Sequence, residues 1–109
     1  MLATNVVVGR DEIDLVAVDP GPPEWLVFVE VRSNTSGRFG APEESVAGAK
    51  LRRTYRAAFA LLRAGSLSGG PVLPHLPWRV DVVVVEHRPS LGQGVGGPTV
   101  RHLRGVAPE

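Results

Sequence analysis

The first third of the chain shows the pattern of hydrophobic and polar positions that β-strands produce. Strands are predicted at residues 5–8 and 12–18, joined by a hairpin turn at residues 9–11 that contains Gly and Asp. A turn rich in Pro and Gly occupies residues 19–23, and residues 25–32, which are β-branched or aromatic almost throughout, predict a third strand. Three consecutive strands joined by short turns predict an antiparallel meander.

A single amphipathic helix is predicted in the middle of the chain, after a polar loop at residues 33–40. Residues 49–64 repeat apolar positions with a period of about 3.6 residues, and Gly65 marks the end of the helix. Pro42, followed by two glutamates, is typical of a helix start. The residues that would share the apolar face are Leu51, Tyr55, Ala58 and Leu62.

Residues 79–86 predict a fourth strand. Their unbroken run of valines indicates burial on both faces, as in a central or parallel strand. A glycine-rich loop at residues 89–98 is expected to be flexible, and residues 99–103 predict a last short strand. The order βββ-α-β(β) predicts one α/β domain over residues 1–109, built on a mixed sheet.

The composition fits a globular domain and excludes several classes of protein. The chain has 109 residues, of which 43% are hydrophobic and 21% are charged. It contains no apolar run near the ~20 residues of a membrane-spanning helix, and its start lacks the pattern of a secretory signal. The absence of cysteine excludes disulfides, zinc knuckles and thiol catalysis. A cytoplasmic location is therefore expected.

Charge is unevenly distributed, although the formal net charge is only +1. Residues 1–30 hold one basic and six acidic side chains, whereas residues 31–109 hold eleven basic and five acidic ones. This distribution can place an acidic pocket inside a basic surface, an arrangement that suits phosphodiester chemistry. Solvated surface charges of both signs would give the same counts.

Carboxylates occur on two strands that are neighbours in the predicted meander. Glu12 and Asp14 are two residues apart, so they would point to one face of their strand while Ile13 and Leu15 point to the other. Glu30 lies within an apolar strand, where a carboxylate is costly to bury unless it is paired or binds a metal. Asp14 and Glu30 are therefore predicted to meet across adjacent strands.

Two chemical interpretations of this pair remain open. Two carboxylates suit Mg²⁺ or Mn²⁺, which would polarise a phosphoryl oxygen and activate a water molecule. Arg32, two residues after Glu30, would then hold the phosphate. The alternative is an interstrand ion pair in which Arg32 or Arg79 neutralises one of the carboxylates.

Four segments resemble one known protein family, in order and over nearly the whole chain. They are residues 3–16, with Gly9-Arg10-Asp11-Glu12-Ile13-Asp14, then 28–32, Phe28-Val29-Glu30-Val31-Arg32, then 39–50 and 77–83. The chain is similar there to the YraN-like uncharacterised protein family, which is grouped with the restriction-endonuclease-like, Holliday-junction-resolvase-like nucleases. The resemblance implies a mixed β-sheet flanked by helices. It also implies that Asp14 and Glu30 are the aspartate and the glutamate of a D…ExK motif.

The chain departs from that family at two points. Arg32 stands where the motif usually has lysine, and arginine is not deprotonated in proteins, so Arg32 could clamp a phosphate but not act as a base. Lys50, the single lysine, is a candidate stand-in, with a solvated helix lysine as the alternative. Family members also usually carry a helix ahead of the segment that matches residues 2–5, and this chain begins after it.

Three weaker signals are interpreted as structural. Asp81 shares the parity of Arg79 along its strand, which favours an ion pair over a metal ligand. The three histidines have no metal-ligand spacing. Tyr55 and Trp78 could stack on a base, but packing against the sheet is the expected role of both.

The sequence thus predicts a Mg²⁺- or Mn²⁺-dependent endonuclease that acts on DNA. The alternatives are a catalytically silent nucleic-acid-binding module and a protein-interaction or dimerisation domain. A homodimer is a further expectation, because junction-cutting relatives of the superfamily are typically dimers. The predicted catalytic residues are Asp14, Glu30, Arg32 and Lys50, the predicted metal ligands are Asp14, Glu30 and Glu12, and the predicted DNA-backbone contacts are Arg38, Arg52, Arg53 and Arg56.

Overall fold

The part of the chain that the structure describes consists of β-strands and one long helix. The structure is a computed structural model that describes residues 1–34, 47–67, 70–87 and 98–107. The expected loop at residues 89–98 therefore lies outside the described residues except for Pro98, and so does the helix start at Pro42. The elements in chain order are β1 (Ala3–Val8), β2 (Asp11–Asp19), β3 (Trp25–Asn34), α2 (Ala47–Ala64), β4 (Trp78–His87) and β5 (Pro98–Leu103).

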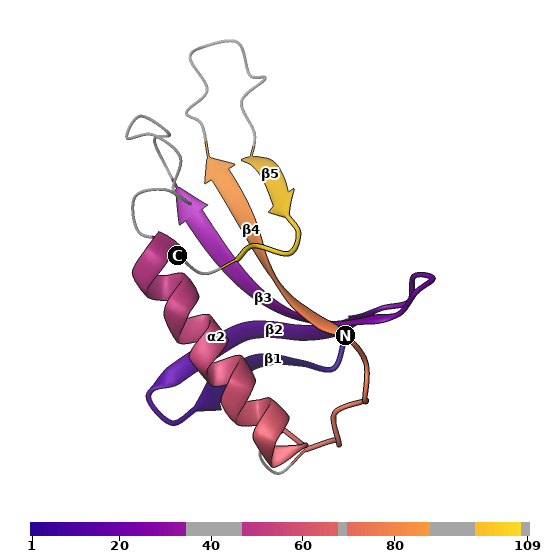
Figure 1. Cartoon of the computed structure of the whole chain (residues 1–109). Helices are drawn as coiled ribbons and strands as arrows, with labels where there is room; N and C mark the ends of the chain where they lie inside the picture. Colours follow the sequence, from indigo (N-terminus) through magenta and orange to yellow (C-terminus); the bar gives the residue numbers. More distant parts are fainter. Residues whose placement is uncertain (35–46, 68–69, 88–97, 108–109) are drawn as a thin grey trace, which may run out of the picture.

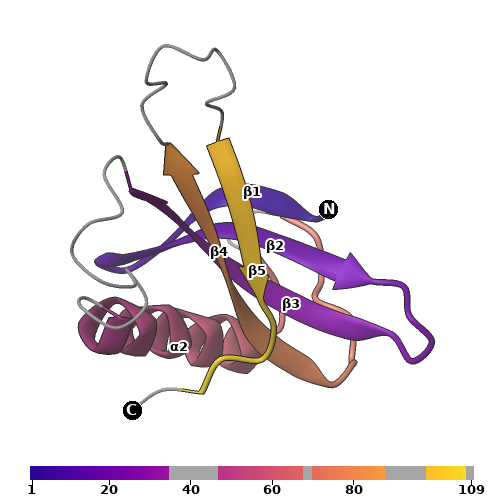
Figure 2. The same ribbon diagram turned by 90° about the horizontal axis from the view of Figure 1, so that it is seen from above.

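The strands form one mixed sheet in the order β1-β2-β3-β4-β5. The pairs β1–β2, β2–β3 and β4–β5 are antiparallel, whereas β3 and β4 are parallel. A parallel pair needs a crossover connection, and α2 lies in the one between β3 and β4. Figures 1 and 2 show that α2 packs on one face of the sheet. The predicted meander and the central, parallel position of β4 are confirmed.

Helix α2 forms because its apolar and small residues recur on one side. The buried positions are Leu51, Thr54, Ala57, Ala58 and Leu61, whereas the predicted Tyr55 and Leu62 lie at the margin of that face and are partly buried. The helix ends as predicted, because Gly65 adopts a left-handed φ of 77° and its N–H donates to the carbonyl of Leu61 at 2.8 Å. Within the described residues, no helix is long and apolar enough to span a membrane.

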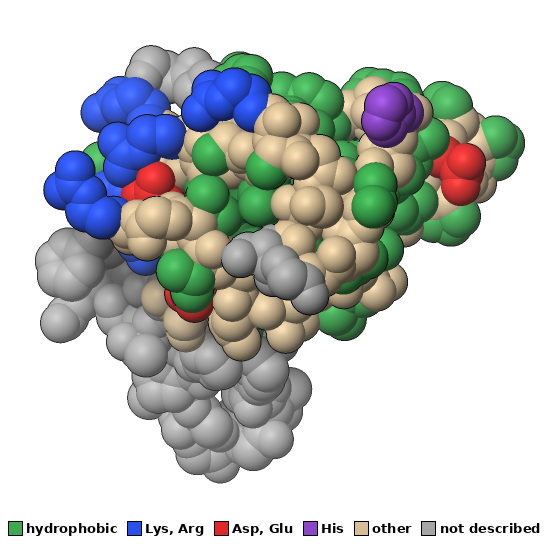
Figure 3. All heavy atoms as spheres, turned by 90° about the horizontal axis from the view of Figure 1, so that it is seen from below, with side chains coloured by type: hydrophobic (Ala, Val, Ile, Leu, Met, Phe, Trp, Pro, Cys, Tyr) green, Lys and Arg blue, Asp and Glu red, His purple; other side chains and the backbone are tan. Residues whose placement is uncertain are grey.

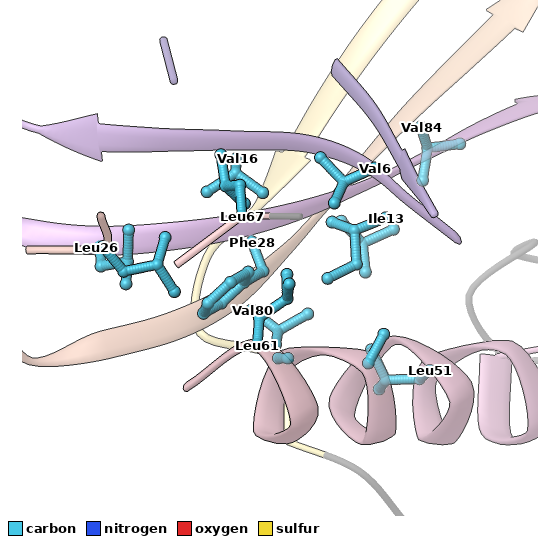
Figure 4. Packing of buried hydrophobic residues seen from close by; sticks show 14 residues of the cluster. Val6, Ile13, Val16, Leu26, Phe28, Leu51, Leu61, Leu67, Val80 and Val84 are labelled. Carbon is cyan, nitrogen blue, oxygen red and sulfur yellow. The ribbon is translucent and has the colours of Figure 1, made fainter. Parts of the chain in front are cut away.

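The core lies between α2 and the sheet face that it covers. Phe28 is fully buried there, and its ring meets the edge of Trp78 at a centroid distance of 5.9 Å. Figure 4 shows the side chains of the strands pointing toward those of α2. The largest buried side chains of this layer include Ile13, Val16, Leu26, Phe28, Val80, Val82 and Val84.

The prediction that β4 is buried on both faces holds for only one of them. Val82 and Val84 face α2 and are buried, while Val83 and Val85 on the opposite face are partly exposed. The reason is that α2 covers one side of the sheet. The opposite side carries an apolar depression of about 450 Å³ lined by residues of β2, β3 and β4.

The β1–β2 hairpin changes the direction of its side chains halfway along. Ile13 and Val16 both lie in the core although they are three residues apart, and Leu15 lines the opposite face. The predicted shared face of Ile13 and Leu15 is therefore wrong. The change coincides with a kink in β1 at Asn5, which has a left-handed φ of 51° and lies between Thr4 and Val6, the residues paired with Leu15 and Ile13.

This kink predicts a clear difference between two substitutions of Asn5. Asn5→Val should lower the free energy of unfolding by about 1–3 kcal/mol, because a β-branched residue is strained at positive φ. Asn5→Gly should stay within about 1 kcal/mol of the parent chain, because glycine adopts this conformation freely. Urea unfolding midpoints measure both effects. Equal midpoints for the two variants would show that the conformation of Asn5 does not matter.

Candidate active site

A cleft of about 240 Å³ opens where β2 and β3 meet the first turns of α2, and it holds both predicted carboxylates. Asp14 lies on β2 and Glu30 lies in the middle of β3. Figure 3 shows Lys and Arg side chains gathered around acidic ones at one end of the molecule. The residues that line the cleft are Arg10, Asp11, Glu12, Asp14, Glu30, Val31, Lys50, Arg53 and Thr54.

Asp14 is partly buried and anchored through one of its oxygens. Its Oδ2 accepts a hydrogen bond from the backbone N–H of Val31 at 2.7 Å. That N–H is available because the regular β2–β3 pairing ends at Leu15 and Val29. Among the described residues, the other oxygen of Asp14 has no hydrogen-bond partner, which leaves it open to a ligand in the cleft.

Glu30 is only 8% exposed, and both of its oxygens accept hydrogen bonds. Oε2 receives the Nε–H of Arg32 at 2.6 Å, and Oε1 receives the hydroxyl of Thr54 at 3.1 Å. The Thr54 hydroxyl also lies 3.1 Å from the carbonyl oxygen of Lys50, and its single proton can serve one acceptor at a time. A buried carboxylate needs such partners to remain charged.

The position of Arg32 differs from the expected phosphate clamp. Its side chain is 4% exposed and pairs with Glu30 on the same strand. Arg32 does not belong to the lining of the cleft. The predicted ion pair therefore exists, but it lies within β3 rather than between two strands. The positive charges that line the cleft come instead from Arg10, Lys50 and Arg53.

The arginines predicted to contact DNA fall into different settings. Arg56 makes two hydrogen bonds of 2.8 Å to the carboxylate of Asp11 and remains 66% exposed. These bonds from Arg56 lower the pKa of Asp11 below its ordinary value. Arg52 and Arg53 lie on exposed positions of α2. Arg38 lies outside the described residues.

Four residues that line the cleft were not among the predicted site residues, namely Arg10, Asp11, Val31 and Thr54. Arg10 lies in the hairpin turn between β1 and β2, where nothing in the pattern distinguishes it from a solvated turn residue. Thr54 had a usable signal, because it is a polar residue three positions after Leu51, within the apolar phase of the helix. A polar side chain at such a position usually has a buried partner.

A second polar cluster lies on the sheet face opposite α2. Asp81 is 1% exposed and accepts hydrogen bonds from Arg79 Nε and the Gly105 N–H, each at 2.9 Å, and its other oxygen lies 2.8 Å from His102 Nε2. Arg79 also contacts Asp19. The predicted structural role of Asp81 is thus confirmed. Burial alone would raise the pKa of Asp81, but the hydrogen bonds from Arg79, Gly105 and His102 outweigh burial and lower it.

The lowered pKa values predict that the fold weakens in acid. Asp11, Asp19 and Asp81 bind protons more weakly when folded than when unfolded, so their contribution is complete above about pH 4 and is lost as the pH falls through the folded values. The thermal midpoint should therefore drop on acidification below about pH 4. Asp81→Asn should be less stable at neutral pH and should lose less on acidification. Parallel pH profiles for the two proteins would contradict this role of Asp81.

Comparison with known proteins gives one consistent result. A family model described as "Uncharacterised protein family UPF0102" matches residues 1–85. A UPF0102 protein of Arthrobacter sp. (strain FB24) is 43% identical over 96 residues, which cover 87% of this chain and 69% of that protein. A relative in Symbiobacterium thermophilum is 43% identical over 91 residues, which cover 83% of this chain and 69% of the relative. A relative in Anaeromyxobacter dehalogenans is 42% identical over 107 residues, which cover 90% of this chain and 73% of the relative. No solved structure is significantly similar to the chain.

Proposed function

The chain belongs to the uncharacterised protein family UPF0102, in agreement with the family resemblance of its sequence, and we propose that it is a Mg²⁺- or Mn²⁺-dependent endonuclease that hydrolyses phosphodiester bonds in DNA. The observation that carries the proposal is the convergence of Asp14 and Glu30 on one cleft with a basic rim. The mixed sheet with α2 on one face is compatible with a restriction-endonuclease-like fold, which is part of the proposal.

The donor atoms of the cleft fit a hard divalent cation. Asp14 offers an oxygen that has no hydrogen-bond partner among the described residues, and Glu30 offers Oε1, which retains a lone pair beside its bond from Thr54. The described residues contain no group of three or more His, Cys, Asp or Glu side chains that could enclose a metal. Few protein ligands suit Mg²⁺ or Mn²⁺, which keep several waters and bind substrate phosphates. When bound, such an ion would polarise the phosphoryl oxygen and lower the pKa of a coordinated water.

The chain's own side chains would divide the remaining tasks. Arg10 and Arg53 on the rim would hold the DNA backbone through their guanidinium groups. Arg32 fixes the orientation of Glu30 from within β3, through the bond from its Nε–H to Oε2. Lys50, which lines the cleft, would take the place of the motif lysine by holding the attacking water or the scissile phosphate.

Stabilisation by Mn²⁺ tests the metal site separately from catalysis. An ion that binds only the folded chain stabilises it by about 2.7 kcal/mol at a hundredfold excess over its dissociation constant. The thermal midpoint of the wild type should therefore rise with Mn²⁺, and that of Asp14→Asn should not. Lys50→Gln should keep the Mn²⁺ response but lose DNA nicking, because the substitution removes a cation and leaves both carboxylates intact. If Mn²⁺ does not change the thermal midpoint of the wild type, the proposed metal site is contradicted.

One observation supports a second candidate, a nucleic-acid-binding module without hydrolysis. The guanidinium of Arg32 already neutralises Glu30, which weakens the attraction of that carboxylate for a cation. In that case the wild type would bind DNA with a steep dependence on salt. It would show neither a response to Mn²⁺ nor nicking.

A further inference from the structure

We propose that the half-exposed ring of Phe59 on α2 stacks on an unpaired base of the DNA, with the strand's phosphates held by the neighbouring arginines. The inference rests on the proposed function and specifies its substrate. The preferred DNA would carry unpaired nucleotides next to the cleaved bond, as flaps and branched junctions do.

Phe59 is 50% exposed although it belongs to a packed aromatic cluster. Its ring meets that of Trp78 edge-on, at a centroid distance of 5.2 Å and an angle of 83°, and lies 6.4 Å from Tyr55. Trp78 in turn packs on the buried Phe28, and the Tyr55 hydroxyl donates to the carbonyl of Val106 at 2.6 Å. The predicted packing roles of Tyr55 and Trp78 are thus confirmed. Phe59 is left as an ordered ring that loses little entropy when it binds.

The surroundings of Phe59 are basic. It lines a shallow depression of about 510 Å³ together with Tyr55 and the three arginines Arg52, Arg56 and Arg63, and none of the described residues in this lining is acidic. Arg56 remains 66% exposed despite its bonds to Asp11. Positive charge that follows a backbone, with aromatic rings on which bases stack, is the usual design of sites for single-stranded nucleic acid. The charge and the ring together therefore favour a polynucleotide over an apolar partner.

The depression lies close to the candidate active site along the same helix. Thr54 lines the cleft and Phe59 follows five residues later, a rise of roughly 7.5 Å along the axis and a rotation of roughly 140°, so the two side chains lie on different sides of α2. Arg56 connects the two sites, because it lines the depression and bonds to Asp11 in the cleft. Successive nucleotides of one strand in duplex DNA are ~3.4 Å apart. A strand whose scissile phosphate lies at the cleft would therefore need several nucleotides to pass around α2, over the exposed Arg56, to Phe59.

The geometry of stacking explains why the base should be unpaired. Inside a duplex each base is covered on both faces by its neighbours, so a protein ring reaches only the base edges. A base in a flap, a gap or a junction offers a free face at little unstacking cost. Phe59 would therefore add affinity for such DNA and none for a fully paired duplex.

Two measurements in EDTA test the inference independently of hydrolysis, with a duplex carrying an oligo-dT flap and the same duplex without the flap. Phe59→Leu keeps an apolar side chain against Trp78, whereas Phe59→Tyr keeps the ring. Phe59→Leu should weaken binding to the flap DNA by roughly 5- to 150-fold and leave duplex affinity unchanged. Phe59→Tyr should keep the preference for the flap DNA. Arg63→Gln should weaken the binding of both DNAs equally. It should also reduce the slope of log affinity against log salt concentration by about one.

The fluorescence of Trp78 gives a local readout. In a Trp25→Phe background Trp78 is the only tryptophan, and the flap DNA, but not the duplex, should quench its emission. The inference would be overturned if Phe59→Leu bound each of the two DNAs with the same affinity as the wild type. It would also be overturned if Phe59→Leu lost the same factor of affinity for the flap DNA and for the duplex. If flap binding depends on Phe59 but Mn²⁺ supports no nicking, the proposed hydrolysis fails and the stacking site stands. If nicking occurs without a preference for flap DNA, the stacking site fails and the proposed hydrolysis stands.

Discussion

Asp14→Asn is expected to lower the rate of Mn²⁺-dependent DNA nicking by roughly a thousandfold or more. The proposed metal ion would supply several kcal/mol of transition-state stabilisation, and each 1.4 kcal/mol corresponds to about a factor of ten in rate. The carboxamide that replaces the carboxylate keeps an oxygen for the N–H of Val31, so the anchor at 2.7 Å is retained while the charge is lost. Supercoiled plasmid, with nicked circles counted over time, is a suitable substrate.

The choice of Asp14 rather than Glu30 follows from their surroundings. Glu30→Gln would remove the charge that Glu30 contributes to a buried ion pair with Arg32, and breaking a buried pair commonly destabilises a protein by about 3–5 kcal/mol. Lost nicking would then report unfolding as well as chemistry. Glu24→Gln, a carboxylate outside the cleft, is the matched control and should nick at the wild-type rate. Wild-type nicking by Asp14→Asn would place the activity elsewhere or in a contaminant.

Phe28→Ala is expected to lower the free energy of unfolding by about 3–5 kcal/mol. Phe28 is fully buried between the sheet and α2, and its ring packs on Trp78. Removing the ring therefore leaves a cavity that the surrounding valines cannot close. For a domain of ordinary stability, about 5–15 kcal/mol, this loss is a large fraction of the total. Urea unfolding at constant slope measures it.

Phe59→Ala provides the matched control for this loss. The residue type and the substitution are the same, but Phe59 is 50% exposed. Removal of this ring changes the buried area less than removal of Phe28. The lost contact with Trp78 should lower the free energy of unfolding by about 0.5–1.5 kcal/mol in addition. Equal losses at the two positions would mean that the layer between α2 and the sheet is not the principal core.

The strands and the helix could be predicted because their signals are local. Alternating and β-branched residues fix β1 to β3, and Gly65 fixes the end of α2. The centre of the buried face of the helix was predicted less accurately. Ala57 and Leu61 are buried because of the angle at which α2 crosses the sheet, which the sequence does not give. The change of facing at Asn5 had only a weak local signal, because asparagine is enriched at left-handed backbone positions but mostly occurs elsewhere.

The candidate site was predictable to the level of which strands carry it. The meander places Asp14 and Glu30 on neighbouring strands, and the structure brings both to one cleft. The partner of Arg32 and the role of Thr54 depend on side-chain rotamers and on the docking of α2, which no spacing along the chain determines. Tyr55 and Trp78 pack as expected, whereas the half-exposed ring of Phe59 was not singled out from the sequence.

The left-handed residue on β1 also bears on how the sheet avoids polymerising. Strands β1 and β5 are the two edges of the sheet, and each exposes a valine, Val7 at 63% and Val100 at 62%. An uninterrupted apolar edge is a template on which another chain can add a strand and begin an aggregate. Asn5 interrupts the first edge, and Pro98, which lacks an amide proton, begins the second. The backbone at Asn5 and the proline at residue 98 therefore make both edges poorer templates for an added strand.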